Sequence, residues 1–353
     1  MKAYNIAVIA GDGIGPEVIA QGVRVLERVA ANHDIDLRLE HHPWGSDYYF
    51  EHDCMMPAGA LDLLKDQDAI YLGAVGDPRL QDNVTLNGLI LPIRRTFQQY
   101  ANVRPAFLFD GVKSPLAGKK PGSIDCVLVR ENTEGEYSQV GGRVHTLSEA
   151  EVAIQTSVFS FRGTERIVRY AFELAGQRDR MRKVTSITKS NAMGYGMTLW
   201  DEVFEKVAQE YPAVATESLL VDAACMDLIR RPEDFDVIVA SNLFGDILSE
   251  ITAAITGSLG LAASANLDPT RKYPSMFESV HGSAPDIAGK GVANPVATIL
   301  AGHMMLEFLG EKAASAAIYQ AVLRYLKECP NKTADLGGTA TCREAGDQIL
   351  AFL

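Results

Sequence analysis

Two carboxylates, Asp246 and Glu250, stand four residues apart in the segment 241–250, which reads SNLFGDILSE. The apolar run 235–240 predicts a buried strand before it, and Asn242 can cap a helix that begins there. On this helix the two acids share a face and repel each other by roughly a few tenths of a kcal/mol, unless a divalent cation lies between them. A solvated acidic face is the alternative. Because apolar residues flank the pair, we predict a site for Mg²⁺ or Mn²⁺, which suit oxygen ligands.

Three arginines have positions suited to binding the carboxylates of a substrate. Arg94 lies in a predicted amphipathic helix that runs to about residue 100, Arg104 follows that helix, and Arg130 ends the predicted strand 124–129. A guanidinium at a strand end or turn can bind a carboxylate through two parallel hydrogen bonds. The alternative at each position is an ion pair with a structural Asp or Glu.

A lysine and a further acid follow two other predicted strands. Lys189 comes directly after 184–188, and Asp222 comes after 214–220. The carboxyl ends of strands are where α/β folds bind ligands. Desolvation or nearby cations can make a lysine a base, so Lys189 is a candidate for proton abstraction.

The elements that must position these residues alternate between strands and helices, which predicts an α/β fold. Predicted strands are 6–10, 36–42, 69–76, 124–129, 184–188, 214–220 and 235–240; predicted helices include 17–32, 164–175, 197–211, 294–309, 311–328 and 341–352. The first turn, GDGIGP at 11–16, has GxGxG spacing followed by proline. It lacks the GxGxxG of a Rossmann dinucleotide site and instead indicates a tight turn that a ligand can approach closely.

Two segments lie outside this alternation of strands and helices. The stretches 137–145 and 151–160 are extended, with glycines at 141 and 142, and predict a protruding hairpin of the kind that clasps a partner subunit. The stretch 277–295 is rich in Gly, Ser and Pro and predicts a long loop. Long loops in compact domains are usually functional.

Composition and charge exclude several classes of protein. The chain of 353 residues has a formal net charge of −12, which disfavours nucleic-acid binding. Its five cysteines form no CxxC motif, which indicates neither a zinc site nor disulfides and fits reduced thiols in a cytoplasm. No signal peptide is visible, and the apolar run 296–309 is too short to span a bilayer. We therefore expect a cytoplasmic protein with neither nucleic-acid nor membrane partners.

Six motifs, in this order along the chain, resemble those of the β-decarboxylating dehydrogenases, the isocitrate, 3-isopropylmalate and tartrate/D-malate dehydrogenase type. The motifs are GDGIGPE at 11–17, Arg94 with Arg104 and Pro105, RENTEGEY at 130–137, TKSN at 188–191, SNLFGDILS at 241–249 and HGSAPDIAGKGVANP at 281–295. The stretches LAGKKPGSID at 116–125, YAFELA at 170–175 and SANLDP at 264–269 look most like the tartrate/D-malate branch.

The resemblance implies a two-domain α/β subunit without a Rossmann fold, working as a homodimer with shared active sites in a cleft. Residues 1–100 with 252–353 would form a large domain carrying most NAD-binding loops. Residues 101–251 would form a small domain with the metal and dimer-interface elements, including the arm near 137–160. A small dicarboxylate is the implied substrate.

The resemblance also implies a role for each matching residue. Lys189, reaching across the dimer from the second subunit, would be the base and Tyr137 the acid. Arg94, Arg104 and Arg130 would bind substrate carboxylates. Asp246 and Glu250 would bind the divalent metal together with Asp222 of the second subunit, and a monovalent cation is a further possible requirement. Residues implied in cofactor binding are Ile14, Gly73, Asn191, Glu278, His281, Gly282, Ser283, Ala284, Asp286, Ile287 and Asn294. Asp286 with Ile287 resembles the pair that selects NAD, since a carboxylate accepts hydrogen bonds from a ribose 2′-hydroxyl and repels a 2′-phosphate.

Two positions depart from the family pattern. Glu250 stands where relatives usually carry aspartate, and its carboxylate reaches about 1.5 Å further. It would bind through a water or favour a looser ion such as Mn²⁺, because Mg²⁺ tolerates little distortion. Asn87 stands where isopropylmalate enzymes have glutamate and the tartrate/D-malate branch has tryptophan.

Asn87, Ile90 and Leu91 would face the substituent that distinguishes one substrate from another. Branch resemblance favours D-malate or tartrate, oxidised by NAD⁺ with loss of CO₂. The alternative is 3-isopropylmalate, because Ile90 and Leu91 can line an apolar pocket. A non-catalytic regulatory homologue, suggested by Glu250, is opposed by Tyr137 and Lys189.

Overall fold

The computed structural model describes residues 2–353 and contains two compact units. The first comprises the chain up to Gln99, Val103–Asp125 and Thr252–Leu353, and the second comprises Tyr100–Asn102 and Cys126–Ile251. These boundaries differ from the expected ones at 103–125, a stretch that we expected in the small domain. This stretch packs on the chain ends: Asp110 pairs with Lys327 at 2.9 Å, and Gly111 lies so close to the Leu326 carbonyl that a Cβ would not fit.

The first unit is built on a mostly parallel sheet. Its strand order is β2 (Ile35–His42), β1 (Lys2–Gly11), β3 (Ala69–Ala74), β12 (Ser275–Ser279), β11 (Ala263–Leu267) and β4 (Ala101–Phe107), the last belonging to this unit from Val103 onward. The β11–β12 pair is antiparallel. We had predicted neither β4 nor β11 and had assigned most of β12 to a loop. In β11 and β12 small and polar residues occupy buried positions, so the sequence lacks a strand-like apolar alternation.

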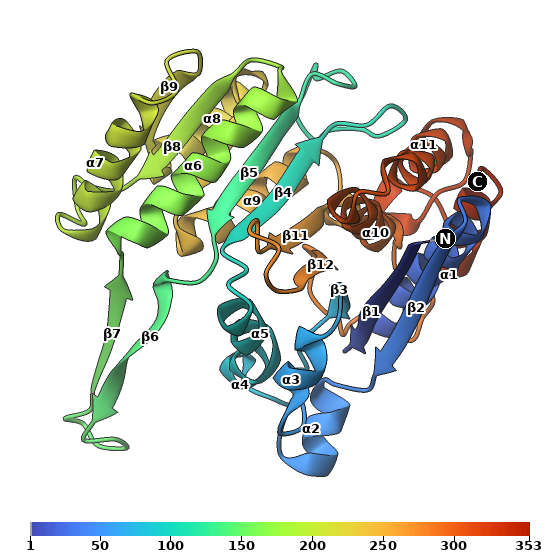
Figure 1. Ribbon diagram of the computed structural model, residues 1–353, viewed down its shortest axis with the longest axis horizontal. Coiled ribbons are helices and arrows are strands. Elements are labelled where there is room, and N and C mark those ends of the chain that lie inside the picture. The colour runs from blue at the N-terminus through green and yellow to red at the C-terminus, as the bar shows by residue number, and fades with distance from the viewer. Residues whose placement is uncertain (1) are drawn as a thin grey trace. The chain divides into compact units, whose positions relative to one another are not determined.

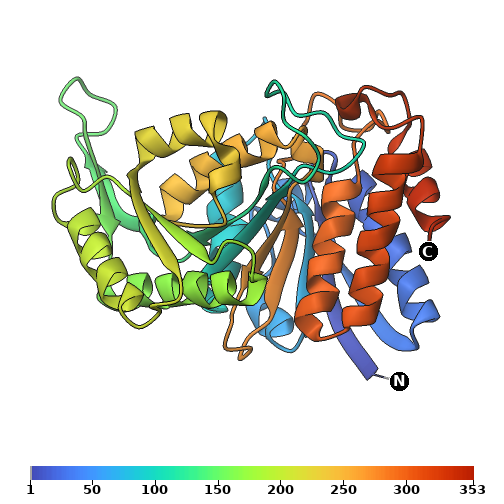
Figure 2. The ribbon, with the colours of Figure 1, turned by 90° about the horizontal axis from the view of Figure 1, so that it is seen from above.

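Helices cover both faces of this sheet (Figures 1 and 2). The helices α1 (Gly15–Asn32), α10 (Val296–Leu309), α11 (Lys312–Glu328) and α12 (Cys342–Leu350) pack together, with α1 against β3 and α10 against β12. The other face is covered by α2 (Ser46–His52), α3 (Ala60–Lys65), α4 (Asp82–Thr85), η1 (Leu86–Ile90, one π-helical turn) and α5 (Leu91–Thr96). Ile9 and Leu72 of the sheet meet Leu89 and Phe97 in this second core.

The second unit has a parallel sheet of β5 (Asp125–Glu131), β10 (Val237–Ala240), β8 (Lys183–Thr188) and β9 (Ala215–Leu220), in that order. The helices α6 (Phe161–Arg178) and α7 (Gly196–Ala208) cover one face, and α8 (Val221–Arg230) and α9 (Asn242–Ile255) cover the other (Figures 1 and 2). All these strands end at one edge. Arg130, Lys189 and Ser241 lie at that edge, each at or just after a strand end.

The predicted arm is an antiparallel hairpin of β6 (Gly135–Val144) and β7 (Val152–Val158). It projects from the second unit in Figure 1, and every residue of β7 is exposed. Its exposed apolar side chains are Val140, Val144, Leu147, Val152, Ile154 and Val158. A two-stranded ribbon is marginally stable by itself, so an apolar arm of this kind suits contact with another chain.

The five cysteines are free thiols, as expected. Among residues 2–353, no helix combines the length and the hydropathy needed to cross a bilayer.

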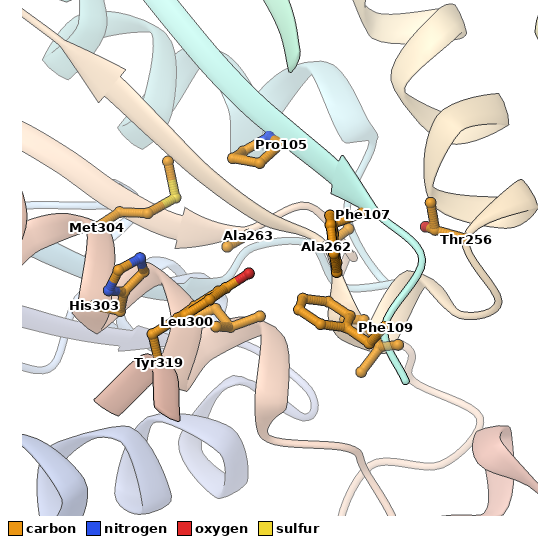
Figure 3. Close-up of a pocket in the computed structure, with 11 residues that line it drawn as sticks. Pro105, Phe107, Phe109, Thr256, Ala262, Ala263, Leu300, His303, Met304 and Tyr319 are labelled. Carbon is orange, nitrogen blue, oxygen red and sulfur yellow. The ribbon is translucent and has the colours of Figure 1, made fainter. Parts of the chain in front are cut away.

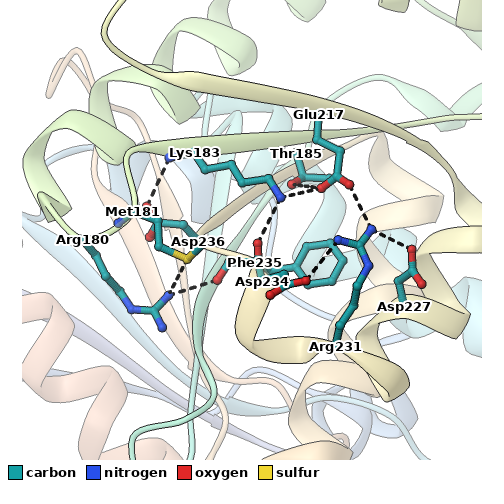
Figure 4. A network of polar contacts seen from close by, with 10 residues as sticks. All are labelled: Arg180, Met181, Lys183, Thr185, Glu217, Asp227, Arg231, Asp234, Phe235 and Asp236. Carbon is teal, nitrogen blue, oxygen red and sulfur yellow. Dashed lines mark hydrogen bonds and ion pairs between the residues drawn. The ribbon is translucent and has the colours of Figure 1, made fainter.

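An ion-pair network joins the opposite, amino-terminal ends of β8, β9 and β10 (Figure 4). Glu217 pairs with Lys183 at 2.7 Å and with Arg231 at 2.9 Å. The fully buried Asp236 accepts hydrogen bonds from Arg178 Nε at 3.0 Å and from the Met181 amide at 3.2 Å. None of the residues implied in catalysis or binding takes part, so this network is structural.

Substituting Asp236 should therefore reduce stability without affecting ligand binding. In an Asp236→Asn variant we expect the free energy of unfolding to fall by about 1.5–3 kcal/mol, because the buried hydrogen bond from Arg178 Nε loses its charged acceptor. Urea denaturation measures this change. The matched control is Asp179→Asn, whose ion pair with Arg182 is largely exposed and should contribute about 0–1 kcal/mol. Equal losses in both variants would contradict the assignment.

Candidate active site

The helix α9 begins at Asn242, and a glutamate from another element caps it. Glu136 of β6 accepts hydrogen bonds from the Leu243 amide at 3.0 Å and from Ser241 Oγ at 2.7 Å. We had expected Asn242 to provide the cap. It is instead the first helical residue, and its side-chain oxygen accepts from Arg130. A carboxylate at a helix N-terminus also interacts favourably with the helix dipole.

Asp246 stands at the centre of a polar cluster on α9. One of its oxygens pairs with Arg130 Nη1, and the other accepts a hydrogen bond from Tyr137 Oη at 2.8 Å. Its side chain is 38% exposed, and Glu250 one turn later is exposed. For Asp246 the alternative of a merely solvated acid is therefore wrong.

Arg130 is almost fully buried at the end of β5. Its Nε and Nη2 donate to Asn242 Oδ1 at 3.0 and 2.7 Å, and its guanidinium lies 5.2 Å from the centre of the Tyr137 ring. A Cβ at Gly245 would lie 2.7 Å from Cβ and Cγ of Arg130. Glycine at 245 thus makes room for the arginine stem, a reason that the spacing of the motif did not reveal.

The acids of the segment 131–137 hold this part of the second unit together. Glu131 is buried and accepts from the amides of Thr133 and Glu134. Burial raises the pKa of Glu131, although these hydrogen bonds oppose the shift. Glu134 accepts from the amide and hydroxyl of Ser160, the residue that caps α6. Glu134 and Glu136 thereby join the N-termini of α6 and α9 to β6, which carries Tyr137.

Lys189 and Asp222 meet within one chain. Lys189 Nζ lies 2.6 Å from Asp222 Oδ1, and this hydrogen bond lowers the pKa of Asp222. Lys189 directly follows β8, and Asp222 lies in the first turn of α8. Asn191, expected at the cofactor, is exposed two residues further along.

The three predicted metal ligands do not gather within one chain. Over residues 2–353, no group of three or more His, Cys, Asp or Glu side chains is arranged to hold a metal ion. Asp246 and Glu250 nevertheless present accessible carboxylate oxygens one turn apart, and the side chain of Asp222 is 66% exposed. An all-oxygen set of accessible carboxylates suits a hard divalent cation.

In the first unit, Arg94 and Glu278 form a buried ion pair at 2.8 Å. Glu278 Oε1 also accepts from Asn266 at 2.7 Å. For Arg94 an ion pair with a glutamate was the alternative to substrate binding, and the structure contains that ion pair. Arg104 is buried on β4. The predicted helix beyond Arg94 ends earlier than expected, at Thr96.

The residues expected to face the distinguishing substituent lie on η1 and α5. Asn87 is partly exposed, whereas Ile90 and Leu91 are each 7% exposed. Ile90 packs in the core with Leu89 and Phe97. Asn87 thus offers more accessible surface than its two apolar neighbours. Single π-helical turns are frequent at functional sites.

A cavity of about 340 Å³ in the first unit includes several predicted cofactor residues. Its lining contains Ile14, His281, Ala284, Ile287 and Asn294 from the predicted set, together with Ser258, Leu259, Gly260, Val292, Ala293, Ala334 and Asp335. Small-molecule sites have volumes of roughly 300–1,000 Å³, so the cavity is large enough to hold part of a nucleotide.

Among the lining residues that sequence reasoning missed, Asp335 is the one with a charged side chain. Its carboxylate accepts hydrogen bonds from Ser258 Oγ, from Asn294 Nδ2 at 2.9 Å and from Thr333 Oγ1 at 2.6 Å. It therefore ties together three segments that are distant in sequence. In the sequence, the glycines at 337 and 338, which follow Asp335 closely, could have indicated a turn with a functional role.

The loop 280–295 is attached to the glycine turn by its backbone. The Ile14 amide donates to Ser283 O at 2.8 Å, and a Cβ at Gly13 would lie 2.0 Å from that oxygen. Gly73 packs equally closely on Ala10 O and does not line the cavity. Glycines here serve close backbone packing.

His281 lines this cavity and is buried. Burial lowers the pKa of His281, so the ring is neutral near pH 7. Its Nδ1 lies 3.0 Å from the carbonyl of Gly282, and among the described residues its Nε2 has no hydrogen-bond partner. Gly282 and Asp286 are exposed, and Ser283 is buried.

A second hollow in the first unit, of about 90 Å³, lies between β4, β11, α10 and α11 (Figure 3). Phe107, Phe109, Met304 and Tyr319 give it an apolar lining without a carboxylate, lysine or arginine. It is unsuited to a dicarboxylate.

Comparison with known proteins agrees with the sequence motifs. Residues 5–349 match the family model described as isocitrate/isopropylmalate dehydrogenase. The D-malate dehydrogenase [decarboxylating] of Escherichia coli strain K12 is 51% identical, and the match covers 100% of this chain and 99% of that protein. The tartrate dehydrogenase/decarboxylase of Pseudomonas putida is 48% identical, with 98% and 97% covered.

A solved structure agrees as well. The crystal structure of isocitrate dehydrogenase from Methylococcus capsulatus superposes with a TM-score of 0.88 at 34% identity, covering 99% of each chain. The predicted fold class and resemblance are confirmed. The chain therefore belongs to the isocitrate/isopropylmalate dehydrogenase family, in its tartrate/D-malate branch.

Proposed function

We propose that this enzyme oxidises D-malate or tartrate at the CH–OH group with decarboxylation, using NAD and a divalent metal. The observation that carries the proposal is near-50% identity, over the whole chain, to proteins named D-malate and tartrate dehydrogenase/decarboxylase. The polar cluster around Asp246 and the Lys189–Asp222 pair supply residue types that this reaction needs. The substrate 3-isopropylmalate is the alternative.

The cavity lined by Ile14, His281 and Asn294 supports NAD as the cofactor. The exposed Asp286 precedes the lining residue Ile287. A carboxylate at this position favours a ribose 2′-hydroxyl over a 2′-phosphate.

We assign the divalent metal to Asp246 and Glu250, with the partner's Asp222 as the third carboxylate. Their accessible oxygens fit Mg²⁺ or Mn²⁺. Asp246 already contacts Arg130 and Tyr137, so this assignment puts a cation beside the residues proposed for substrate binding and protonation. A further requirement for a monovalent cation stays a prediction.

Arg94, Arg104 and Arg130 are proposed to bind the two substrate carboxylates. Guanidinium groups can bind carboxylates through two parallel hydrogen bonds, which suits an anionic substrate in a chain of net charge −12. Arg94 and Arg130 are held by Glu278 and Asp246, so their guanidinium groups are oriented before substrate arrives. Orientation in advance reduces the entropy cost of binding.

Lys189 is proposed to remove the hydroxyl proton, and Tyr137 to protonate the enol carbon after CO₂ is lost. Bound NAD⁺ would accept a hydride, and the divalent ion would acidify the hydroxyl and stabilise charge on the oxygen. Lys189 Nζ lies 2.6 Å from Asp222 Oδ1 within one chain, so Lys189 must exchange this contact for the substrate hydroxyl when it acts as a base.

We further propose a homodimer in which the β6–β7 arm contacts the second subunit. The exposed valines, leucine and isoleucine of the arm support this. A cytoplasmic location, and the absence of nucleic-acid and membrane partners, stay predictions.

A substrate panel tests the proposed function directly. We expect purified protein with NAD⁺ and Mn²⁺ to form NADH with D-malate or tartrate at a kcat/KM at least about tenfold above that with 3-isopropylmalate, an expectation that rests on the relatives. Faster turnover of 3-isopropylmalate would support the alternative. Retained NAD⁺ binding without turnover of any of the three would favour a regulatory homologue.

The base is tested by a Lys189→Met variant. We expect kcat to fall by about 10²–10⁴, the usual contribution of general acid–base catalysis, while NAD⁺ affinity is retained. Steady-state NADH formation and calorimetric NAD⁺ binding measure the two quantities. The control is Lys206→Met, whose side chain lies over the Phe161 ring on the surface. Full activity of Lys189→Met would overturn the mechanism.

A further inference from the structure

We propose that Asn242 is a positioning residue, which orients the Arg130 guanidinium for binding the substrate carboxylate. This inference rests on the substrate-binding role proposed for Arg130. Asn242 is the first residue of α9, and the proposed mechanism gives it no role of its own.

The contact between the Asn242 and Arg130 side chains is buried and made through two hydrogen bonds. Asn242 Oδ1 accepts from both Nε and Nη2 of Arg130, at 3.0 and 2.7 Å, and each residue is only 2% exposed. Two donors on one edge of the planar guanidinium fix its rotation as well as its position. The Nη1 of the opposite edge is then directed at Asp246.

Asn242 is itself held in one orientation. Its Nδ2 donates to the backbone oxygen of Glu134 at 3.0 Å, which determines that the amide oxygen faces Arg130. Gly135 also packs close to this side chain, since a Cβ added at position 135 would lie 3.4 Å from Asn242 Cβ. The backbone of Asn242 is fixed as the first residue of α9. The asparagine therefore links the helix that carries Asp246 to the strand end that carries Arg130.

A neutral acceptor is required here for an electrostatic reason. Arg130 and Asp246 have opposite charges and together are close to neutral. An aspartate at 242 would retain the acceptor but add a buried negative charge beside Arg130, and it would lose the donor to Glu134. The extra charge would compete with an anionic substrate for Arg130. Asparagine provides the geometry without that competition.

Kinetics of two variants test the proposal. In Asn242→Ala and Asn242→Asp we expect KM for D-malate, or for whichever panel substrate is turned over, to rise by about tenfold or more. KM for NAD⁺ should change less than about twofold, because Asn242 is not among the residues that line the cavity proposed for NAD. The aspartate variant should have the higher KM for the substrate of the two, and this difference should grow as the ionic strength is lowered.

The matched control is Glu134→Gln, which disturbs the same loop through the α6 cap but leaves the contact with Asn242, made by the Glu134 backbone, in place. It should lower the melting temperature without raising KM for the substrate. A similar rise of KM in this control, or no rise in Asn242→Ala, would overturn the proposal.

A double-mutant cycle separates positioning from general stability. If Asn242 acts through Arg130, Asn242→Ala should have less than about a twofold further effect on KM in an Arg130→Lys background. Additive losses would indicate an independent structural role and overturn the proposal.

The crystal structure of Asn242→Ala tests the orientation without relying on turnover. We expect the guanidinium to rotate away from its present position, while the backbone of β5 stays in place. An unchanged guanidinium would overturn the proposal even if the enzyme is fully active on D-malate. Failure of the proposed function itself would be seen separately, as a lack of NADH formation by the wild-type protein in the substrate panel.

Discussion

The ion pair between Arg130 and Asp246 is the interaction on which the candidate site of the second unit depends. Arg130 brings a charge to the carboxyl end of β5 that is too deeply buried to remain without an anionic partner. Asp246 provides that partner from the first turns of α9 and also accepts from Tyr137. A substrate carboxylate or a metal ion would enter a network whose charges are already balanced and oriented.

Much of the surrounding sequence serves this pair. Gly245 makes room for the arginine stem, Asn242 orients the guanidinium, and Glu136 caps the helix that carries Asp246. The candidate residues lie at the carboxyl edge of the parallel sheet, whereas the ion pairs of Glu217 and Asp236 hold the amino edge. Stability and the proposed chemistry are thus assigned to opposite ends of the same strands.

The first unit uses backbone contacts rather than charge to build its cavity. The turn 11–16 accommodates the loop 280–295 because Gly13 has no side chain where Ser283 O approaches. Asp335 then connects Ser258 and Asn294 across the cavity wall. This arrangement differs from a Rossmann site, where the glycines approach the pyrophosphate.

Sequence patterns predicted the features that local spacing determines. The pair Asp246 and Glu250, the β6–β7 hairpin and Lys189 at a strand end all follow from short-range periodicity. The roles of Asn242 and Asp335 depend on partners more than 40 residues away, as the separations of 112 from Arg130 and 41 from Asn294 indicate, so no local pattern encodes them. The strands β11 and β12 were missed because small and polar residues stand among the apolar ones at their buried positions, so neither segment shows a strand-like alternation.

The position of the metal tests the account most directly. Crystals grown with Mn²⁺ and substrate allow the ion to be located by its anomalous scattering. We predict a single strong site within coordination distance of Asp246 and the partner's Asp222, with Glu250 bound directly or through one water. A manganese ion bound elsewhere, or bound without Asp246, would contradict the assignment of α9 as the metal-binding helix.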